Sequence, residues 1–391
     1  MNALKYDLLI TGGLLIDPSQ GINDQRDIAV SGGKVAAIEK NISAEEAKEV
    51  FDALGKIVTP GLVDIHTHIY RLVSYLGADP DLNCLAKGVT TVVDAGSSGA
   101  LNFPGFRKYI VEACQTRIFE FLHVSDVGLT MGGGIGELED LRHLDFERTV
   151  KVARENRGVI VGIKIRVPQD IVGQHGPQCL RLAKEISRTT GLPLMVHPGA
   201  LPPNLSLIDV LGVLEKGDIM THIYPPPYPP LLPRSSIFNE NGRLLPEIQK
   251  ARDRGVLFDV GHGMNNFCWD TAEEALKQGF MPTTISSDLT AASVNSVVQD
   301  LPTILSKFLH VGISLYDVIK YSTIAPSQIL GKENEIGTLK VGAEADITVF
   351  KLEEGEFPLW DNIRPVKEQR VVKQLLKPVK VVKGGSVIQS S

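Results

Sequence analysis

The chain has 391 residues, of which 43% are hydrophobic and 22% charged, with a mean hydropathy of +0.04. This ordinary globular composition excludes a disordered, collagen-like or coiled-coil chain. The net charge of −6 and the pI near 5.9 provide no basic field for phosphate groups. We therefore expect no nucleic-acid partner.

The cysteine pattern and the first residues predict a cytoplasmic protein. The segment MNALKYDLLITGG has no basic stretch followed by an apolar core and a cleavage site, and no apolar run reaches 18 residues. We therefore expect no membrane partner. The cysteines form no CxxC pair, which argues against a disulfide framework or a structural zinc knuckle and fits a reducing compartment. They are Cys84, Cys114, Cys179 and Cys268.

Both ends of the chain have the same β-rich pattern. Residues 6–58 contain the short runs DLLITGGLLID, DIAVSGGKVAAIE and KIVTPG, in which glycine pairs mark hairpin turns. Residues 337–389 repeat this pattern in GTLKVGAEADITVFKL and PVKVVKGGSVIQ. Neither end has enough strands to bury a face alone. The pattern thus predicts one small β-sandwich domain composed of residues 1–58 and 336–391.

The central segment, residues 59–335, alternates apolar runs with helix-like stretches such as 177–191 and 269–279. A doubly wound sheet would also alternate, but no GxGxxG follows the first run. The order therefore predicts an α/β fold with a (β/α)8 TIM-type barrel, whose sites gather at the C-terminal strand ends. The predicted strands cover residues 62–68, 89–96, 117–126, 158–167, 192–197, 218–224, 255–262 and 283–289.

One proline-rich run, YPPPYPP at residues 224–230, follows the sixth predicted strand. Such a run can serve as a polyproline ligand for a partner domain. A rigid loop beside a barrel site is the interpretation we favour.

The strongest local motif is His66-Thr67-His68, at the end of the first predicted barrel strand. Side chains at positions i and i+2 of a strand point the same way, so both imidazoles face one side together. Imidazole is a preferred zinc ligand, and two of them on one strand end can hold one ion. Taken alone, the motif fits two structural histidines equally well.

Three more residues extend this pattern, because His197, His222 and Asp288 each end a later predicted strand. A single histidine of this kind is more often a hydrogen-bonded core residue. Four histidines and one aspartate at the same barrel end, however, form a coherent set of nitrogen and oxygen donors. Together they predict a metal site.

Lys164 lies within the apolar run GVIVGIKIRV, where an inward-facing charge is costly unless it is paired. One interpretation is an outward-facing lysine with an exposed amine. The other is a lysine that burial and nearby cations keep partly neutral. Such an amine can react with CO2 to give a carbamate that bridges two metal ions.

These motifs resemble the amidohydrolase superfamily of metal-dependent hydrolases, and the resemblance covers nearly the whole chain. It includes VTPGLVDIHTH, GIKIR, SSD and the closing GTLKVGAEADITVF. The resemblance implies two divalent ions, expected to be Zn2+. It assigns His66, His68 and Asp288 to the more buried ion, His197 and His222 to the second, and Lys164, carboxylated by CO2, to both as a bridge.

Two longer segments resemble one branch of this superfamily, a group of deacetylases that are often named dihydroorotase. These segments are GADPDLNCLAKGVTTVVDAGSSG and RGVLFDVGHG. It implies hydrolysis of a small N-acyl amide or O-acyl ester, for instance of an acetylated amino or hydroxy acid. A hydroxide bridging the metals would attack, with Asp288 as the catalytic proton shuttle. Dihydroorotases carry the motif HxHxR. In this chain Tyr70 occupies the position of the motif's arginine, and Arg71 follows one residue later, where a strand would direct it to the opposite face.

Two alternatives stay open. One is a cyclic amidase of dihydroorotase or hydantoinase type. The other is a non-catalytic amidohydrolase-like assembly protein, which would be expected to lose metal ligands that this chain keeps. We expect a small-molecule substrate and a homo-oligomer.

Three residues are candidates for contact with that substrate. Arg166 shares the strand face of Lys164 and could bind a carboxylate bidentately, or form a strand-end salt bridge instead. His262, next to glycines after the seventh strand, could bond the substrate or anchor its loop. Ser98, after the second strand, could belong to a backbone carboxylate site or to a plain turn.

Overall fold

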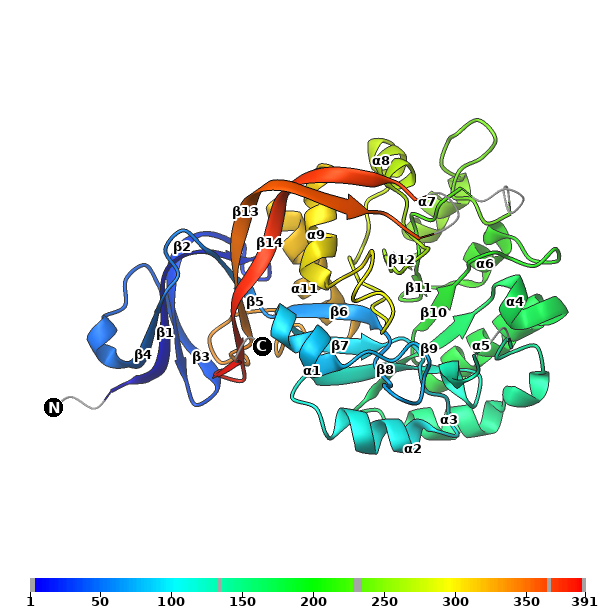
Figure 1. Ribbon diagram of the computed structural model, residues 1–391. Coiled ribbons are helices and arrows are strands. Elements are labelled where there is room, and N and C mark those ends of the chain that lie inside the picture. Colours follow the sequence, from blue (N-terminus) through cyan, green and yellow to red (C-terminus); the bar gives the residue numbers. More distant parts are fainter. Residues whose placement is uncertain (1–3, 133–134, 228–233, 364–366, 389–391) are drawn as a thin grey trace.

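A computed structural model of the chain describes residues 4–132, 135–227, 234–363 and 367–388. Two β-sheets organise the molecule: a mixed sheet with strands from both ends of the sequence, and a parallel sheet that curls into a barrel (Figure 1). The predicted fold class, a barrel accompanied by a small β unit from both termini, is confirmed. The boundaries of the two units along the sequence stay a prediction.

The head and the tail of the chain meet in the mixed sheet. Its order is β15-β14-β13-β5-β1-β2-β3, with β4 paired to β1 outside this path. Strand β5 runs antiparallel to β13, so that Val58 lies opposite Val349, and side chains from both ends fill one buried core. The strands are β1 (Tyr6–Asp17), β2 (Ile22–Ser31), β3 (Lys34–Glu39), β4 (Ala47–Asp52), β5 (Ile57–Pro60), β13 (Ile347–Trp360), β14 (Gln369–Lys383) and β15 (Ser386–Ile388).

Seven consecutive parallel strands form the barrel sheet, and each pairs with the next along the chain. Their apolar side chains are almost all buried, as expected for a parallel sheet covered on both faces. The strands are β6 (Leu62–Thr67), β7 (Val89–Asp94), β8 (Arg117–His123), β9 (Ile160–Arg166), β10 (Leu194–His197), β11 (Ile219–Met220) and β12 (Leu257–Phe258). Each lies within one of the predicted strand ranges.

The eighth predicted strand, residues 283–289, is irregular, yet it closes the barrel. Isolated parallel bridges join Thr284 to Asp259 beyond β12 and Leu289 to Thr67 of β6. Asp288 adopts a φ of +49°, which interrupts a regular ladder. The chain therefore completes the ring with two short contacts instead of one strand.

Helices cover the barrel and carry their apolar residues toward it. In α5, the buried residues Cys179, Leu180, Ala183 and Ile186 follow helical spacing, and Gly191 ends the helix with a φ of +68°. The helices are α1 (Pro80–Asn83), α2 (Phe103–Phe106), α3 (Phe146–Glu155), α4 (Gln169–Val172), α5 (Gly176–Thr190), α6 (Leu207–Val213), α7 (Pro246–Asp253), α8 (Trp269–Lys277), α9 (Leu301–His310), α10 (Leu315–Tyr321) and α11 (Ile324–Ile329). Among the described residues, none of the helices combines the length and the apolar character needed to cross a bilayer.

The hairpin of β13 and β14 extends from the mixed sheet over the barrel. Its outer part lies across α9 and ends near α8 (Figure 1). The backbone N–H of Leu376 in β14 donates to Ser306 Oγ of α9 at 2.8 Å. The C-terminal part of the chain thus contacts the barrel close to the loops that follow its strands.

Candidate active site

The barrel brings the predicted metal ligands to one end. His66 and His197 lie at the ends of β6 and β10, and Lys164 lies near the end of β9. His222 follows β11, and Asp288 belongs to the segment that closes the barrel. His222 and Asp288 have φ values of +61° and +49°, conformations that non-glycine residues adopt rarely and that concentrate at functional sites.

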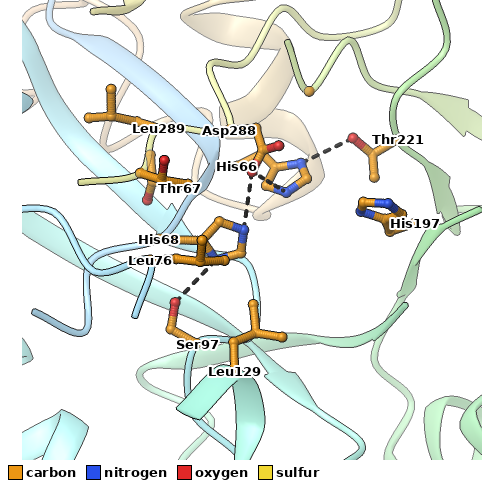
Figure 2. Close-up of polar contacts among 12 residues, drawn as sticks. His66, Thr67, His68, Leu76, Ser97, Leu129, His197, Thr221, Asp288 and Leu289 are labelled. Atoms are coloured by element: carbon orange, nitrogen blue, oxygen red, sulfur yellow. Dashed lines mark hydrogen bonds and ion pairs between the residues drawn. The ribbon is translucent and has the colours of Figure 1, made fainter. Parts of the chain in front are cut away.

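The first group of ligands meets at Asp288 (Figure 2). Asp288 Oδ1 lies 3.4 Å from His66 Nε2 and 3.1 Å from His68 Nε2. The amine of Lys164 lies 3.2 Å from the same His66 nitrogen. The two histidines predicted to hold the deeper ion therefore converge on one oxygen of its third predicted ligand, with the predicted bridging lysine beside them.

The second pair lies next to this group. His222 Nε2 is 2.8 Å from His197 Nδ1, and the ring centroids of His66 and His222 are 5.1 Å apart. Donor atoms of His66, His222 and Asp288 all lie within 4.8 Å of one another. The structure thus gathers all six predicted ligands into one cluster.

The partners of the outer ring nitrogens fit a metal site. His222 Nδ1 lies 2.6 Å from the carbonyl oxygen of Gly261, which can only accept, so Nε2 carries the lone pair. His66 Nδ1 lies 3.0 Å from Thr221 Oγ1, which donates its own proton to Asp259. Outer contacts of this kind fix the tautomer of metal-binding histidines. The inward lone pairs are the donors that a divalent cation takes.

Burial sets the charges of these groups. It lowers the pKa of His66 and His197 well below the ordinary value, and that of His222 to about 4, so these three imidazoles are neutral at pH 7. Burial would raise the pKa of Asp288, but His66 and the hydrogen bond with His68 hold it below its usual range. Neutral imidazoles with an anionic carboxylate are the protonation states that metal binding requires.

Lys164 is fully buried, so the interpretation with an outward-facing amine is wrong. Burial lowers its pKa to about 7, although Asp288 and Asp259 act in the opposite direction. Among the described residues, no carboxylate lies within ion-pair distance of the amine. Besides His66, the amine contacts Met195 Sδ at 3.3 Å. The alkyl part of the side chain packs closely on Gly96, because a Cβ on that glycine would lie only 2.9 Å from Lys164 Cγ. The site therefore contains a lysine with a substantial neutral fraction.

A cavity of about 420 Å³ opens onto the cluster. His68, His197, His222 and Asp288 lie at its inner end, and apolar side chains form most of the remaining wall. Pro225, Pro226 and Pro227 belong to the wall, consistent with a loop beside the site, while residues 228–230 of the proline-rich run lie outside the described residues. The apolar part consists mainly of Leu76, Ile171, Pro198, Leu207, Met220, Ile237, Phe238 and Met264.

The three predicted substrate contacts differ in where they lie. Arg166 lines the cavity, but its guanidinium also binds both oxygens of Glu137, at 2.6 and 2.7 Å. The structure does not place Ser98 or His262 among the residues that line this cavity. The Ser98 hydroxyl donates to Glu120 at 2.5 Å, and both nitrogens of the buried His262 have partners inside the protein. For these two, the turn and loop-anchor interpretations fit the contacts.

Arg71 does not take the place of the arginine in HxHxR. It is half-exposed and pairs with Asp79, and it is not among the residues that line the cavity. This agrees with the one-residue shift seen in the sequence.

Several supporting residues were not selected from the sequence. Asp259 accepts hydrogen bonds from Thr221, Thr284 and Ser286 and lies 3.4 Å from His66 Nδ1. Asp259 could have been predicted from the sequence, because it is a charged residue within an apolar run. The same pattern identified Lys164. No local signal marks Glu137, whose partner is 29 residues away.

The charge of Glu137 makes a testable contribution to stability. Burial would raise its pKa, but Arg166 and His123 lower it to about 2. Because the folded-state pKa lies below the unfolded value of 4.5, the stabilisation is present at pH 7 and is lost as the pH falls from about 4.5 to 2. We expect Glu137→Gln to lower the free energy of unfolding by about 3 kcal/mol at pH 7. The difference from wild type should shrink in urea titrations toward pH 3, and a constant difference would contradict a charge effect.

Comparisons with known proteins place this site in context. The Amidohydrolase family matches residues 268–388. Deacetylase Atu3266 of Agrobacterium fabrum is 34% identical over 390 residues, which cover 99% of this chain and 93% of that protein. A crystal structure described as a dihydroorotase has a TM-score of 0.88 at 33% identity and covers 98% of both chains. Another, described as an adenine deaminase, has a TM-score of 0.87 at 32% identity and covers 98% of this chain and 100% of that chain.

Proposed function

This chain belongs to the amidohydrolase family and is a metal-dependent hydrolase of carbon–nitrogen bonds, and we propose that it is a dinuclear zinc deacetylase. The observation that carries the proposal is the convergence of four histidines, one aspartate and one buried lysine in one cluster, of which His68, His197, His222 and Asp288 line a cavity. The inward lone pairs of the imidazoles support metal binding. The relative named deacetylase, which matches over nearly its full length, supports the reaction class.

In this proposal, His66, His68 and Asp288 would hold one ion, and His197 and His222 would hold the other. Lys164, carboxylated by CO2, would be the ligand common to both. The near-neutral pKa of its buried amine supports this role, because only the neutral amine reacts with CO2. When bound, the ions supply Lewis acidity, which acidifies a water and polarises the scissile carbonyl.

Asp288 is the proton shuttle in this mechanism. Its carboxylate is anionic at pH 7 and faces the cavity, so it can accept the proton of the attacking water. It then delivers this proton to the leaving nitrogen or oxygen. Asn266 Nδ2 lies 3.3 Å from Asp288 Oδ2, which orients the carboxylate for both transfers.

The cavity supports a small N-acyl or O-acyl substrate, such as an acetylated amino or hydroxy acid. Its volume lies within the range of small-molecule sites, and its apolar wall suits the carbon skeleton of such a compound. Arg166 uses two of the five N–H donors of a guanidinium on Glu137. It therefore retains donors for a substrate carboxylate.

A cyclic amidase is the second candidate, favoured by the likeness to the structure described as a dihydroorotase. The position of Arg71 outside the cavity lining argues against it. One activity screen separates the candidates. It should offer N-acetyl-amino acids of both hands, acetylated hydroxy acids, dihydroorotate, hydantoins and adenine.

Metal analysis tests the proposal directly. We expect the purified protein to contain about two zinc ions per chain, because the cluster offers two sets of donors joined by a lysine. A chelator should abolish hydrolysis, and added Zn2+ should restore it. Full activity with one ion per chain would contradict the dinuclear site. A metal-free protein that hydrolyses nothing in the screen would favour the assembly-protein alternative.

A further inference from the structure

A second buried lysine lies outside the metal cluster. Lys307 belongs to α9, and its side chain is fully buried. Its amine lies 2.7 Å from the carbonyl oxygens of Val297 and Trp360 and 2.9 Å from His262 Nε2. An ammonium group has three donors, and three acceptors surround this one. In the described part of the chain, no carboxylate lies within ion-pair distance of it.

The contact between Lys307 and His262 has a defined direction. His262 Nδ1 lies 2.8 Å from the carbonyl oxygen of Gly263, which can only accept, so the ring hydrogen is on Nδ1. His262 Nε2 must then accept from the Lys307 amine. The ring of Phe267 stacks on His262 with centroids 4.6 Å apart and an interplanar angle of 21°. The imidazole is thus fixed on several sides.

His262 belongs to residues 259–268, which we call the support loop. This loop contacts two predicted metal ligands: Gly261 O accepts from His222 Nδ1 at 2.6 Å, and Asn266 Nδ2 reaches Asp288. The loop packs tightly against Asp288, because a Cβ on Gly263 would lie 2.3 Å from its Oδ2. A shift of the support loop must therefore disturb both ligands.

The β13–β14 hairpin holds the support loop from the other side. Trp360, at the end of β13, accepts from Lys307. Just beyond it, the backbone N–H of Ile363 donates to Met264 O at 2.9 Å, and Asn362 Nδ2 donates to Phe267 O at 3.2 Å. A continuous series of contacts leads from the C-terminal hairpin through Lys307 to the support loop and on to the metal ligands.

We propose that Lys307 is a positioning residue for the active site, which ties the support loop to the β13–β14 hairpin and so fixes His222 and Asp288. The inference rests on the proposed metal-dependent function. The alternative is a lysine that only stabilises the fold. The two differ in whether its loss affects the metal site selectively.

Lys307→Met removes the amine and keeps an unbranched apolar chain, and Lys184→Met is a matched control. Lys184 is also a buried lysine, with Asp218 at 2.5 Å and Glu215 at 3.0 Å. Asp218 precedes β11, whereas His222 follows it, so this control lies at the opposite end of the barrel. Both variants should lower thermal stability.

Two measurements distinguish positioning from stability alone. The first is the affinity for cobalt(II), from its visible spectrum in competition with a chelator. We expect Lys307→Met to lower this affinity about 10- to 100-fold, as loss of groups that orient metal ligands does, and Lys184→Met to leave it unchanged. The second is hydrogen exchange of the metal-free protein. Amides of residues 259–268 should exchange faster in Lys307→Met than in Lys184→Met.

Each outcome is decisive. Equal cobalt affinity and equal loop exchange in Lys307→Met and wild type would overturn the positioning role and leave the proposed function intact. A wild-type protein that binds no cobalt would instead overturn the proposed function, and this inference with it. If Lys307→Met does not fold, Asn362→Ala removes another contact of the hairpin with the support loop. It should produce the same selective changes to a smaller degree, and their absence would contradict the proposal.

Discussion

An Asp288→Asn protein is expected to turn over its substrate about 10²- to 10⁴-fold more slowly than wild type, the range that a general acid–base group supplies. Asparagine keeps an oxygen where Asp288 Oδ1 faces His66 and His68, but it cannot accept the proton. Metal content should therefore fall only modestly, while kcat should fall by the factor given above. The measurement pairs steady-state kinetics with elemental analysis of the same sample.

Asp218→Asn is the matched control for this experiment. Asp218 is also buried, but its partner is Lys184 and it lies at the other end of the barrel. We expect this control to lose stability and keep kcat. Near-full activity of Asp288→Asn would contradict the proton-shuttle role. His262 could not then be the substitute base, because its nitrogens bond Gly263 and Lys307 and it is not part of the cavity lining.

The clustering of the predicted ligands could be anticipated because its signal is local. Parallel strands all end at the same edge of a barrel. Once the fold class is recognised, a histidine or aspartate at the end of an apolar run is therefore predicted to lie at that edge. His66, His197 and Asp288 all follow this logic. Lys164 was found because a charge within an apolar strand requires an explanation.

The substrate contacts could not be predicted in the same way, because their roles depend on partners distant in sequence. Arg166 is bound by Glu137, 29 residues earlier, and Ser98 by Glu120, 22 residues later. His262 is bound by Lys307, 45 residues later. Only tertiary packing decides whether such a side chain faces the cavity or another residue.

Two features of the fold also exceeded what the sequence pattern could specify. Residues 283–289 have the composition of a strand, yet Ser286 and Ser287 bond the carboxylates of Asp259 and Asp64. With these side-chain bonds and the positive φ of Asp288, the described segment pairs with its neighbours through isolated bridges instead of a regular strand. The tail was predicted as short strands, whereas the β13–β14 hairpin is long enough to reach the support loop.

Lys164→Ala is expected to lower the metal content more than Asp288→Asn or Lys307→Met does. In the proposed site, this lysine is the ligand common to both ions, so its loss should empty at least one of them. The affinity for that ion should fall by more than the roughly 10- to 100-fold that loss of an orienting group causes. Lys184→Ala, which removes a buried lysine at the opposite end of the barrel, should keep its metal.

Rescue by added acids makes this prediction specific to a carboxylated lysine. The substitution leaves a space beside Gly96 and Met195, next to His66 Nε2, and a short carboxylic acid can occupy it. Its two oxygens would replace those of the carbamate, because carboxylate oxygen is a suitable ligand for zinc. Acetate or propionate should therefore restore part of both the metal content and kcat in Lys164→Ala. Neither acid should help Asp288→Asn, whose defect is the missing base. A Lys164→Ala protein with full metal content, unaffected by either acid, would show that no carbamate on Lys164 bridges the two ions.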